Sequence, residues 1–169
     1  MSRSLLLLLS VLTACRDRQA RPPLAGSAAR DSADSAFGLL QSRGHMAMGV
    51  DQYTSSHRFE PLPDGGRITL QRDGTDSAGT AQIRSHMRMI GQAFQQGDFA
   101  LPGFVHDREV PGTAVMAERR SHISYTTDSL PRGAQLRIHS DDPAAINAIH
   151  QFLAFQRQDH RVGESGAAR

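Results

Sequence analysis

The amino-acid sequence predicts one α+β domain, an antiparallel sheet of about four strands packed by two helices. Two observations predict this fold class. Each half of the chain contains a pair of segments with alternating hydrophobicity around a turn rich in Pro and Gly. Each pair is followed by a segment whose apolar residues recur at helical spacing. The length of 169 residues suits a single domain.

The first pair of segments predicts a hairpin. Residues 57–62 and 67–71 flank the sequence Pro63-Asp64-Gly65-Gly66, a composition typical of a tight turn between strands. The pattern leaves open which face of the sheet His57 occupies. Asp76 or Ser77 can cap the helix that follows, which ends at Gly97. Its apolar stripe consists of Ile83, Met87, Ile90 and Phe94.

The second half repeats this order of elements. Residues 98–113 contain several Pro and Gly residues, which predicts a long irregular loop. Residues 123–125 and 136–138 then predict strands around a second Pro-containing turn, and a helix begins at Asp141 or Asp142. Aligning the two turns places His86 near His150. We therefore expect a β-β-α pseudo-repeat, with chance similarity of the two units as the alternative.

The charged residues and motifs exclude several kinds of chemistry. All 19 basic residues are Arg, so no Lys is present for a Schiff base or a phosphate-binding loop. The formal net charge is +2, only 5% of residues are aromatic and none is Trp, so we expect no nucleic-acid partner. The motifs HExxH, CxxC, GxSxG, GxGxxG and GxxxxGKS do not occur. A binding protein is therefore favoured over an enzyme.

The N-terminus resembles the signal of bacterial lipoproteins. Arg3 precedes a short apolar run, which is below the about 20 residues that span a bilayer, and the run leads to Leu12-Thr13-Ala14-Cys15. The resemblance implies removal of residues 1–14 and lipidation of Cys15, which would attach the chain to a membrane. It also implies export to the periplasmic face of the outer membrane, or to the cell surface. An ordinary secretory signal with an incidental Cys is the alternative.

Composition divides the rest of the chain. Residues 15–34 are rich in Arg, Ala, Ser, Asp and Pro and predict a flexible tether. The folded domain is expected over residues 35–162, followed by a loose tail over residues 163–169. Because Cys15 is the only Cys, a metal site in the domain must use His, Met or carboxylates.

Histidine and methionine carry the most specific chemical signal. The chain has 8 His and 6 Met, and the pattern HMxM occurs at residues 45–48 and again at residues 86–89. Imidazole with thioether is a soft ligand set that favours copper as Cu(I) over zinc. The alternative is that the methionines fill the core, because Met87 lies on a helical apolar stripe.

The predicted loop or helix in which each histidine lies indicates how well it suits a metal ligand. His106 lies beside Asp107 in the predicted loop, and His150 lies on a buried helix face, where its nitrogens need partners. Asp159 can orient an imidazole ring through its second nitrogen. The predicted metal ligands are His57, His86, His106 and His150, with His160, Met48, Met87, Met89 and Met116 as second choices.

Residues 48–160 resemble a family of exported bacterial proteins of uncharacterised activity. The shared motifs are MGxDQ at residues 48–52, HxF at 57–59, IRxH at 83–86, VHD at 105–107 and IHxFLxFQxxDH at 149–160. The resemblance supports the domain limits and emphasises His57, His86, His106, His150 and His160. The family has two adjacent His at the first site, where this chain has His57-Arg58.

The sequence therefore predicts a lipid-anchored periplasmic protein, rich in His and Met, that binds or traffics a transition metal. Two alternatives stay open. One is a metal-free lipoprotein with structural histidines that contacts an unknown protein of the cell envelope. The other is a small metalloenzyme with His106-Asp107 near an open coordination position. A closed set of ligands would indicate the metal-binding protein, and an apolar surface patch would indicate the interaction protein. A cleft with ligands at its floor would indicate the enzyme.

Overall fold

The computed structural model describes residues 25–49 and 52–162, with side chains over residues 30–49 and 53–162. The predicted signal peptide, Cys15 and the predicted tail lie outside the described residues. Within these limits the chain forms a four-stranded antiparallel sheet and five α-helices, which confirms the α+β class. The strands are β1 (Ser55–Leu62), β2 (Gly65–Arg72), β3 (Ile123–Leu130) and β4 (Gly133–Ser140). Short 3-10 helices, η1 (Gln52–Thr54) and η2 (Arg120–His122), precede the two hairpins.

Both predicted hairpins form, and they lie next to each other. The strand order is β1-β2-β4-β3, so that β2 and β4 pair at the centre of the sheet. In each hairpin two residues beginning with Pro separate the strands, as the turn chemistry predicts. The register of β1 on β2 runs without interruption from Ser55↔Arg72 to Leu62↔Gly65. Side chains therefore alternate strictly between a helix-covered face and an open face.

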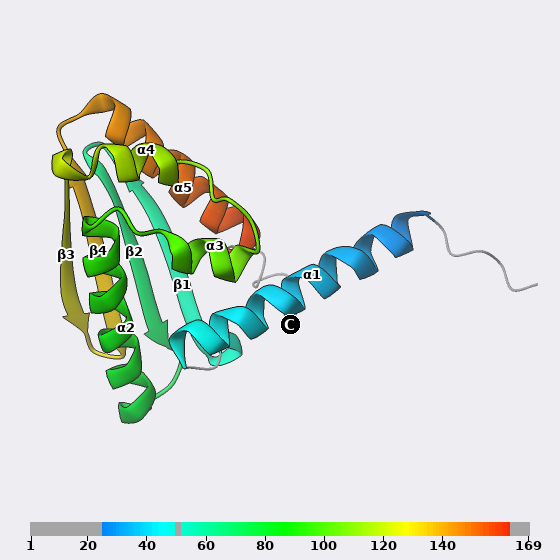
Figure 1. Ribbon diagram of the computed structural model, residues 1–169. Coiled ribbons are helices and arrows are strands. Elements are labelled where there is room, and N and C mark those ends of the chain that lie inside the picture. The colour runs from blue at the N-terminus through cyan, green and yellow to red at the C-terminus, as the bar shows by residue number, and fades with distance from the viewer. Residues whose placement is uncertain (1–24, 50–51, 163–169) are drawn as a thin grey trace, which may run out of the picture.

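The helices α2 (Ser77–Gln95) and α5 (Pro143–Asp159) cover the same face of the sheet (Figure 1). Each lies mainly on the hairpin of the other half of the chain, α2 on β3 and β4 and α5 on β1 and β2. The predicted caps are confirmed. Asp76 accepts a bond from Gly79 N at 3.0 Å, and Asp142 accepts one from Ala144 N at 2.9 Å.

The core fills the space between this sheet face and the helices. Its fully buried side chains come from every layer and include Leu70, Ile83, Leu136, Ile149 and Leu153. The helices approach the sheet closely where a strand residue has no side chain. A Cβ on Gly66 would collide with Leu153 Cδ1, so a larger residue there would force this side chain of α5 to shift.

The segment predicted as an irregular loop instead contains the whole of one helix and the first residue of another. Helix α3 (Ala100–His106) tolerates Pro102 because a proline in the first turn breaks no helical hydrogen bond. Helix α4 (Thr113–Glu118) begins after Gly112, whose φ of +86° suits glycine. A Cβ on Gly112 would also collide with the carbonyl of Ala148 in α5. The loop prediction was wrong because these helices are short and depend on packing against neighbours that the sequence pattern does not show.

Helix α1 (Ala25–Met48) begins inside the segment predicted as a tether and projects away from the sheet (Figure 1). Its C-terminal half packs on α3, where Leu40 is buried and Arg43 Nε donates to Val105 O at 2.8 Å. Farther out, Arg161 Nη1 donates to Asp34 at 2.8 Å. Over the described ranges, no helix combines the length and apolar composition needed to cross a membrane.

Candidate functional site: a cavity lined by histidines

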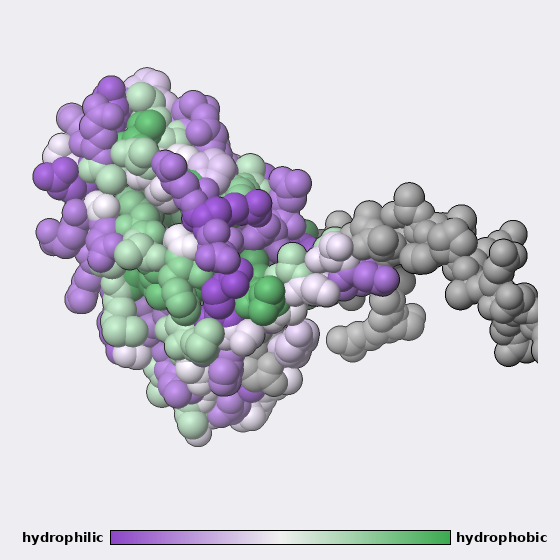
Figure 2. All heavy atoms as spheres, turned by 45° about the vertical axis from the view of Figure 1, so that its right-hand side comes forward, coloured by the Kyte–Doolittle hydropathy of each residue, from purple (hydrophilic) through white to green (hydrophobic). Residues whose placement is uncertain are grey.

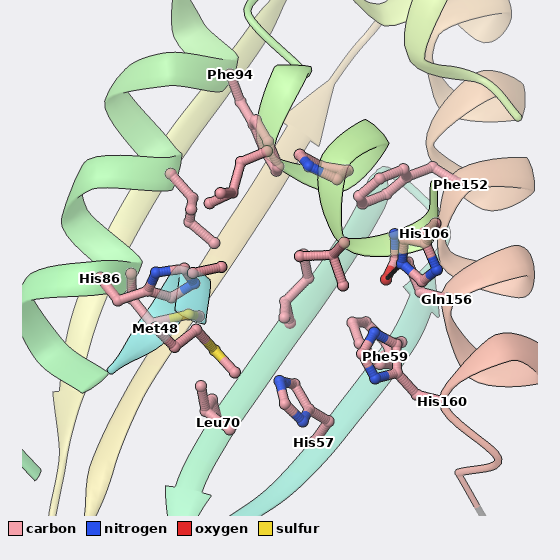
Figure 3. A pocket seen from close by; sticks show the side chains of 17 residues that line it. Met48, His57, Phe59, Leu70, His86, Phe94, His106, Phe152, Gln156 and His160 are labelled. Carbon is pink, nitrogen blue, oxygen red and sulfur yellow. Dashed lines mark hydrogen bonds between the residues drawn. The ribbon is translucent and has the colours of Figure 1, made fainter. Parts of the chain in front are cut away.

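A cavity of about 80 Å³ lies between the helices and the sheet. Its walls come from the end of α1, from α2, α3 and α5, and from β1 and β2. Most of the lining is apolar, and no Asp or Glu from the described part of the chain is among the lining residues. Six predicted ligands line it, namely Met48, His57, His86, Met87, His106 and His160 (Figure 3). Four of the five emphasised histidines therefore converge on one space.

His86 faces the cavity from α2 and is only 7% exposed. Burial lowers its pKa from 6.5 to about 4, so that the ring is neutral at physiological pH. Its Nδ1 is buried and has no hydrogen-bond partner among the residues that the structure describes. A buried nitrogen without a partner is uncommon in folded proteins. His86 therefore has a donor atom that packing does not use.

His57 and His160 form a stacked pair on the opposite side of the cavity. His57 lies on the helix-covered face with Phe59, two residues further along β1, as alternation without a bulge requires. The rings of His57 and His160 are 5.0 Å apart between centroids and inclined by 29°. Burial, with a smaller contribution from the nearby His86, lowers the pKa of His57 to about 4. His160 also has its pKa well below the usual value, first through burial and then through His57 and His106.

His106 is held differently, because both of its ring nitrogens have partners. It closes α3 and is 6% exposed. Its Nδ1 lies 2.5 Å from Asp159 Oδ2, and its Nε2 lies 3.0 Å from Gln156 Oε1. The other oxygen of Asp159 accepts a bond from Arg108 Nη2 at 2.5 Å. The network fixes the ring, and in this arrangement His106 presents no free nitrogen to the cavity.

Three predicted ligands lie elsewhere. His150 is half-buried on α5, and its Nε2 lies 2.9 Å from the carbonyl oxygen of Leu62 at the end of β1. Met116 is fully buried in α4, outside the cavity lining, and Met89 on α2 is 55% exposed. These three residues therefore lie apart from the predicted ligands that line the cavity. His150 points toward the strand end because the α5 residues that enter the cavity are Phe152 and Gln156.

No metal-binding arrangement of imidazoles and carboxylates is already formed. Across residues 25–49 and 52–162, no group of three or more His, Cys, Asp or Glu side chains could hold a metal ion. Methionine adds further donor atoms, because Met48 reaches the cavity from α1 and Met87 reaches it from α2.

Two important residues were missed by reasoning from sequence. Gln156 lines the cavity and bonds to His106, and Arg108 joins the carboxylate that orients the same ring. Asp159 was predicted to orient an imidazole ring, and in the structure this ring belongs to His106. The available signal was spacing: Gln156, Asp159 and His160 are three and four residues apart and share one side of α5.

The surface beside the cavity is partly apolar. Figure 2 shows hydrophobic side chains gathered on the body near the point where α1 leaves it. The large apolar residues that are exposed, among those whose side chains are described, are Leu39, Met46, Tyr53, Met89, Phe104 and Val115. Comparison with known proteins adds no assignment, because no protein-family model, curated protein or solved structure matches this chain.

Proposed function

We propose that this chain binds copper as Cu(I) in the histidine-lined cavity. The observation that carries the proposal is the buried, partnerless Nδ1 of His86 in a space that also receives the thioethers of Met48 and Met87. Imidazole and thioether are both soft, neutral ligands that suit Cu(I). His57 and His160 supply further neutral imidazoles at the opposite wall.

The charge of the cavity favours Cu(I) over zinc. Among the residues that the structure describes, no carboxylate lines the cavity, so a bound metal would keep its full charge in largely apolar surroundings. Burying charge without compensation is costly, and the cost rises steeply with the charge of the ion. A monovalent ion is therefore held more readily than Zn²⁺ by these neutral donors.

The lowered pKa values of the histidines suit the same role. A metal ligand must offer an unprotonated nitrogen, and protons compete with the metal for it. Because the pKa of His57 and of His86 is about 4, both rings remain available as ligands well below neutral pH. Together with lipidation at Cys15, the proposal describes an anchored protein that binds or passes on copper in the cell envelope.

His106 is assigned a positioning role in this proposal. Its two hydrogen bonds to Asp159 and Gln156 hold one wall of the cavity in place. The same bonds also favour the alternative of structural histidines in a metal-free interaction protein, because a ring with both nitrogens bonded needs no metal. The two functions make opposite predictions for His86.

The test is a Cu(I) titration of the purified full chain without a His tag, under anaerobic conditions, against a coloured Cu(I) chelator. We expect one tightly bound Cu(I) per chain and no comparable binding of Zn²⁺. His86→Leu should weaken Cu(I) binding by at least about tenfold, as loss of a ligand requires. His150→Gln is the matched control, because His150 lies outside the cavity and Gln can still donate to Leu62 O. Absence of Cu(I) binding by the parent, or equal affinity in His86→Leu, would reject the proposal.

A further inference from the structure

The two HMxM motifs are divided between the cavity and the surface. In the second motif, His86 and Met87 line the cavity, whereas Met89 is 55% exposed. In the first motif, Met48 lines the cavity and Met46 is 64% exposed. Core packing explains Met87, which is 1% exposed, but a methionine as exposed as Met89 contributes little buried area.

The position of Met89 on α2 links it to the cavity. Spacings of four and three place Gln82, His86 and Met89 on one side of the helix. The end of α1 lies against this side, because a Cβ on Gly49 would be 3.2 Å from Gln82 Nε2. Met89 follows His86 by three residues, about 4.5 Å along the helix axis. It is therefore an exposed thioether one turn from the cavity histidine that has a free nitrogen.

Met46 has a different relation to the cavity. On α1 the residues that face the body are Leu40, Gly44, Ala47 and Met48, which are buried or line the cavity. Met46 lies two residues from both Gly44 and Met48, which on a helix places it on the opposite side. The chain thus offers two exposed methionines, one beside His86 and one directed away from the cavity.

We propose that Met89 captures Cu(I) at the surface and passes it to His86 in the cavity. The inference rests on the proposed function and extends it to the path of the ion. In the transfer step the bond from copper to the Met89 sulfur breaks as a bond from copper to His86 Nδ1 forms. Copper stays Cu(I), and the step requires the neutral His86 tautomer that carries its proton on Nε2, so that Nδ1 offers its lone pair and no proton is released. Met87 and Met48 then supply thioethers inside the cavity.

The experiment measures the rate and the affinity of Cu(I) exchange separately. Cu(I) is presented as its complex with the chelator bathocuproine disulfonate, and its transfer to and from the full chain is followed by stopped-flow absorbance. Met89→Leu keeps an apolar side chain of similar size and removes the sulfur. Met46→Leu is the matched control, the same change at an exposed methionine that faces away.

We expect Met89→Leu to slow uptake and release by about tenfold, with an affinity within about twofold of the parent, since a capture ligand lowers the barrier in both directions. Met46→Leu should exchange at the parent rate. If the parent binds Cu(I) and Met89→Leu exchanges equally fast, the capture role is wrong while the proposed function stands. An affinity loss as large as the rate loss would place Met89 among the resting ligands and also reject it. A parent chain that binds no Cu(I) would reject both proposals.

Discussion

Acid should destabilise this fold because it holds histidines in the neutral form. Burial lowers the pKa of His57 and of His86 from 6.5 to about 4. Between these values the unfolded chain binds more protons than the folded chain, so the free energy of unfolding falls as the pH falls. The stability that depends on the two neutral rings is complete above pH 6.5 and is lost as the pH drops toward 4.

The size of the effect follows from the same values. At pH 5 the unfolded-state pKa of 6.5 lies 1.5 units above the pH, which at about 1.4 kcal/mol per unit costs about 2 kcal/mol for each histidine. The two together cost about 4 kcal/mol, a large share of the roughly 5–15 kcal/mol that stabilises a typical domain. His160, whose pKa is also lowered by burial, acts in the same direction.

The assay is urea unfolding of the purified chain at pH 7.5 and at pH 5.0, followed by circular dichroism. His86→Leu removes one titrating ring and, because Nδ1 has no partner, breaks no hydrogen bond there. At pH 7.5 this variant should be within about 1.5 kcal/mol of the parent, as for other swaps of similar volume. Its loss of unfolding free energy between the two pH values should be smaller than that of the parent by about 2 kcal/mol.

Met87→Leu is the control for this experiment, because it changes a neighbouring buried side chain that does not titrate. It should keep the full acid sensitivity of the parent. An equal loss of stability between pH 7.5 and pH 5.0 in the parent and in His86→Leu would refute the claim that the folded chain holds His86 neutral.

Three further predictions concern the cavity wall, the helix packing and the anchor. Asp159→Asn weakens the bond to His106 and should lower the free energy of unfolding by about 1–3 kcal/mol in urea titrations. Gly66→Ala should cost about 1–3 kcal/mol because its methyl group meets α5, whereas Gly74→Ala, with no atom within 4 Å of its Cβ position, should change the thermal midpoint little. Cys15→Ser should move the chain from the membrane fraction to the soluble fraction of cells, and unchanged fractionation would contradict the lipid anchor.

Local signals account for the parts of the fold that could be predicted. Pro and Gly in the turns, alternation in the strands and Asp at both helix caps act over a few residues, so both hairpins, α2 and α5 were within reach. The strand order β1-β2-β4-β3 and the crossing of each helix to the other hairpin are long-range features. Local periodicity says nothing about such contacts, which is also why α3 was missed.

The same distinction applies to the site. Residue type and motif selected four histidines that the fold brings to one cavity. Their convergence could not be derived, because His57, His86, His106 and His160 lie on different elements whose arrangement is set by sheet order. His150 was selected by the same reasoning but lies outside the cavity. It shares a helix with Gln156, but a difference of six residues turns it toward the strand end instead of the cavity.

The two helix histidines that the sequence aligns, His86 and His150, differ in the bonding of their ring nitrogens, and this difference supports the proposal of a ligand in the cavity. Nε2 of His150 bonds to Leu62 O at 2.9 Å, so this residue ties α5 to β1 and its polar atom serves the fold. His86 occupies α2 with its Nδ1 buried and unbonded, which costs about 1–3 kcal/mol relative to a satisfied group. Packing alone does not explain why a residue with this free-energy cost occupies the position, since a leucine would fill the same apolar wall. A bond from Nδ1 to a bound metal ion removes it, and the thioethers of Met48 and Met87 line the same cavity.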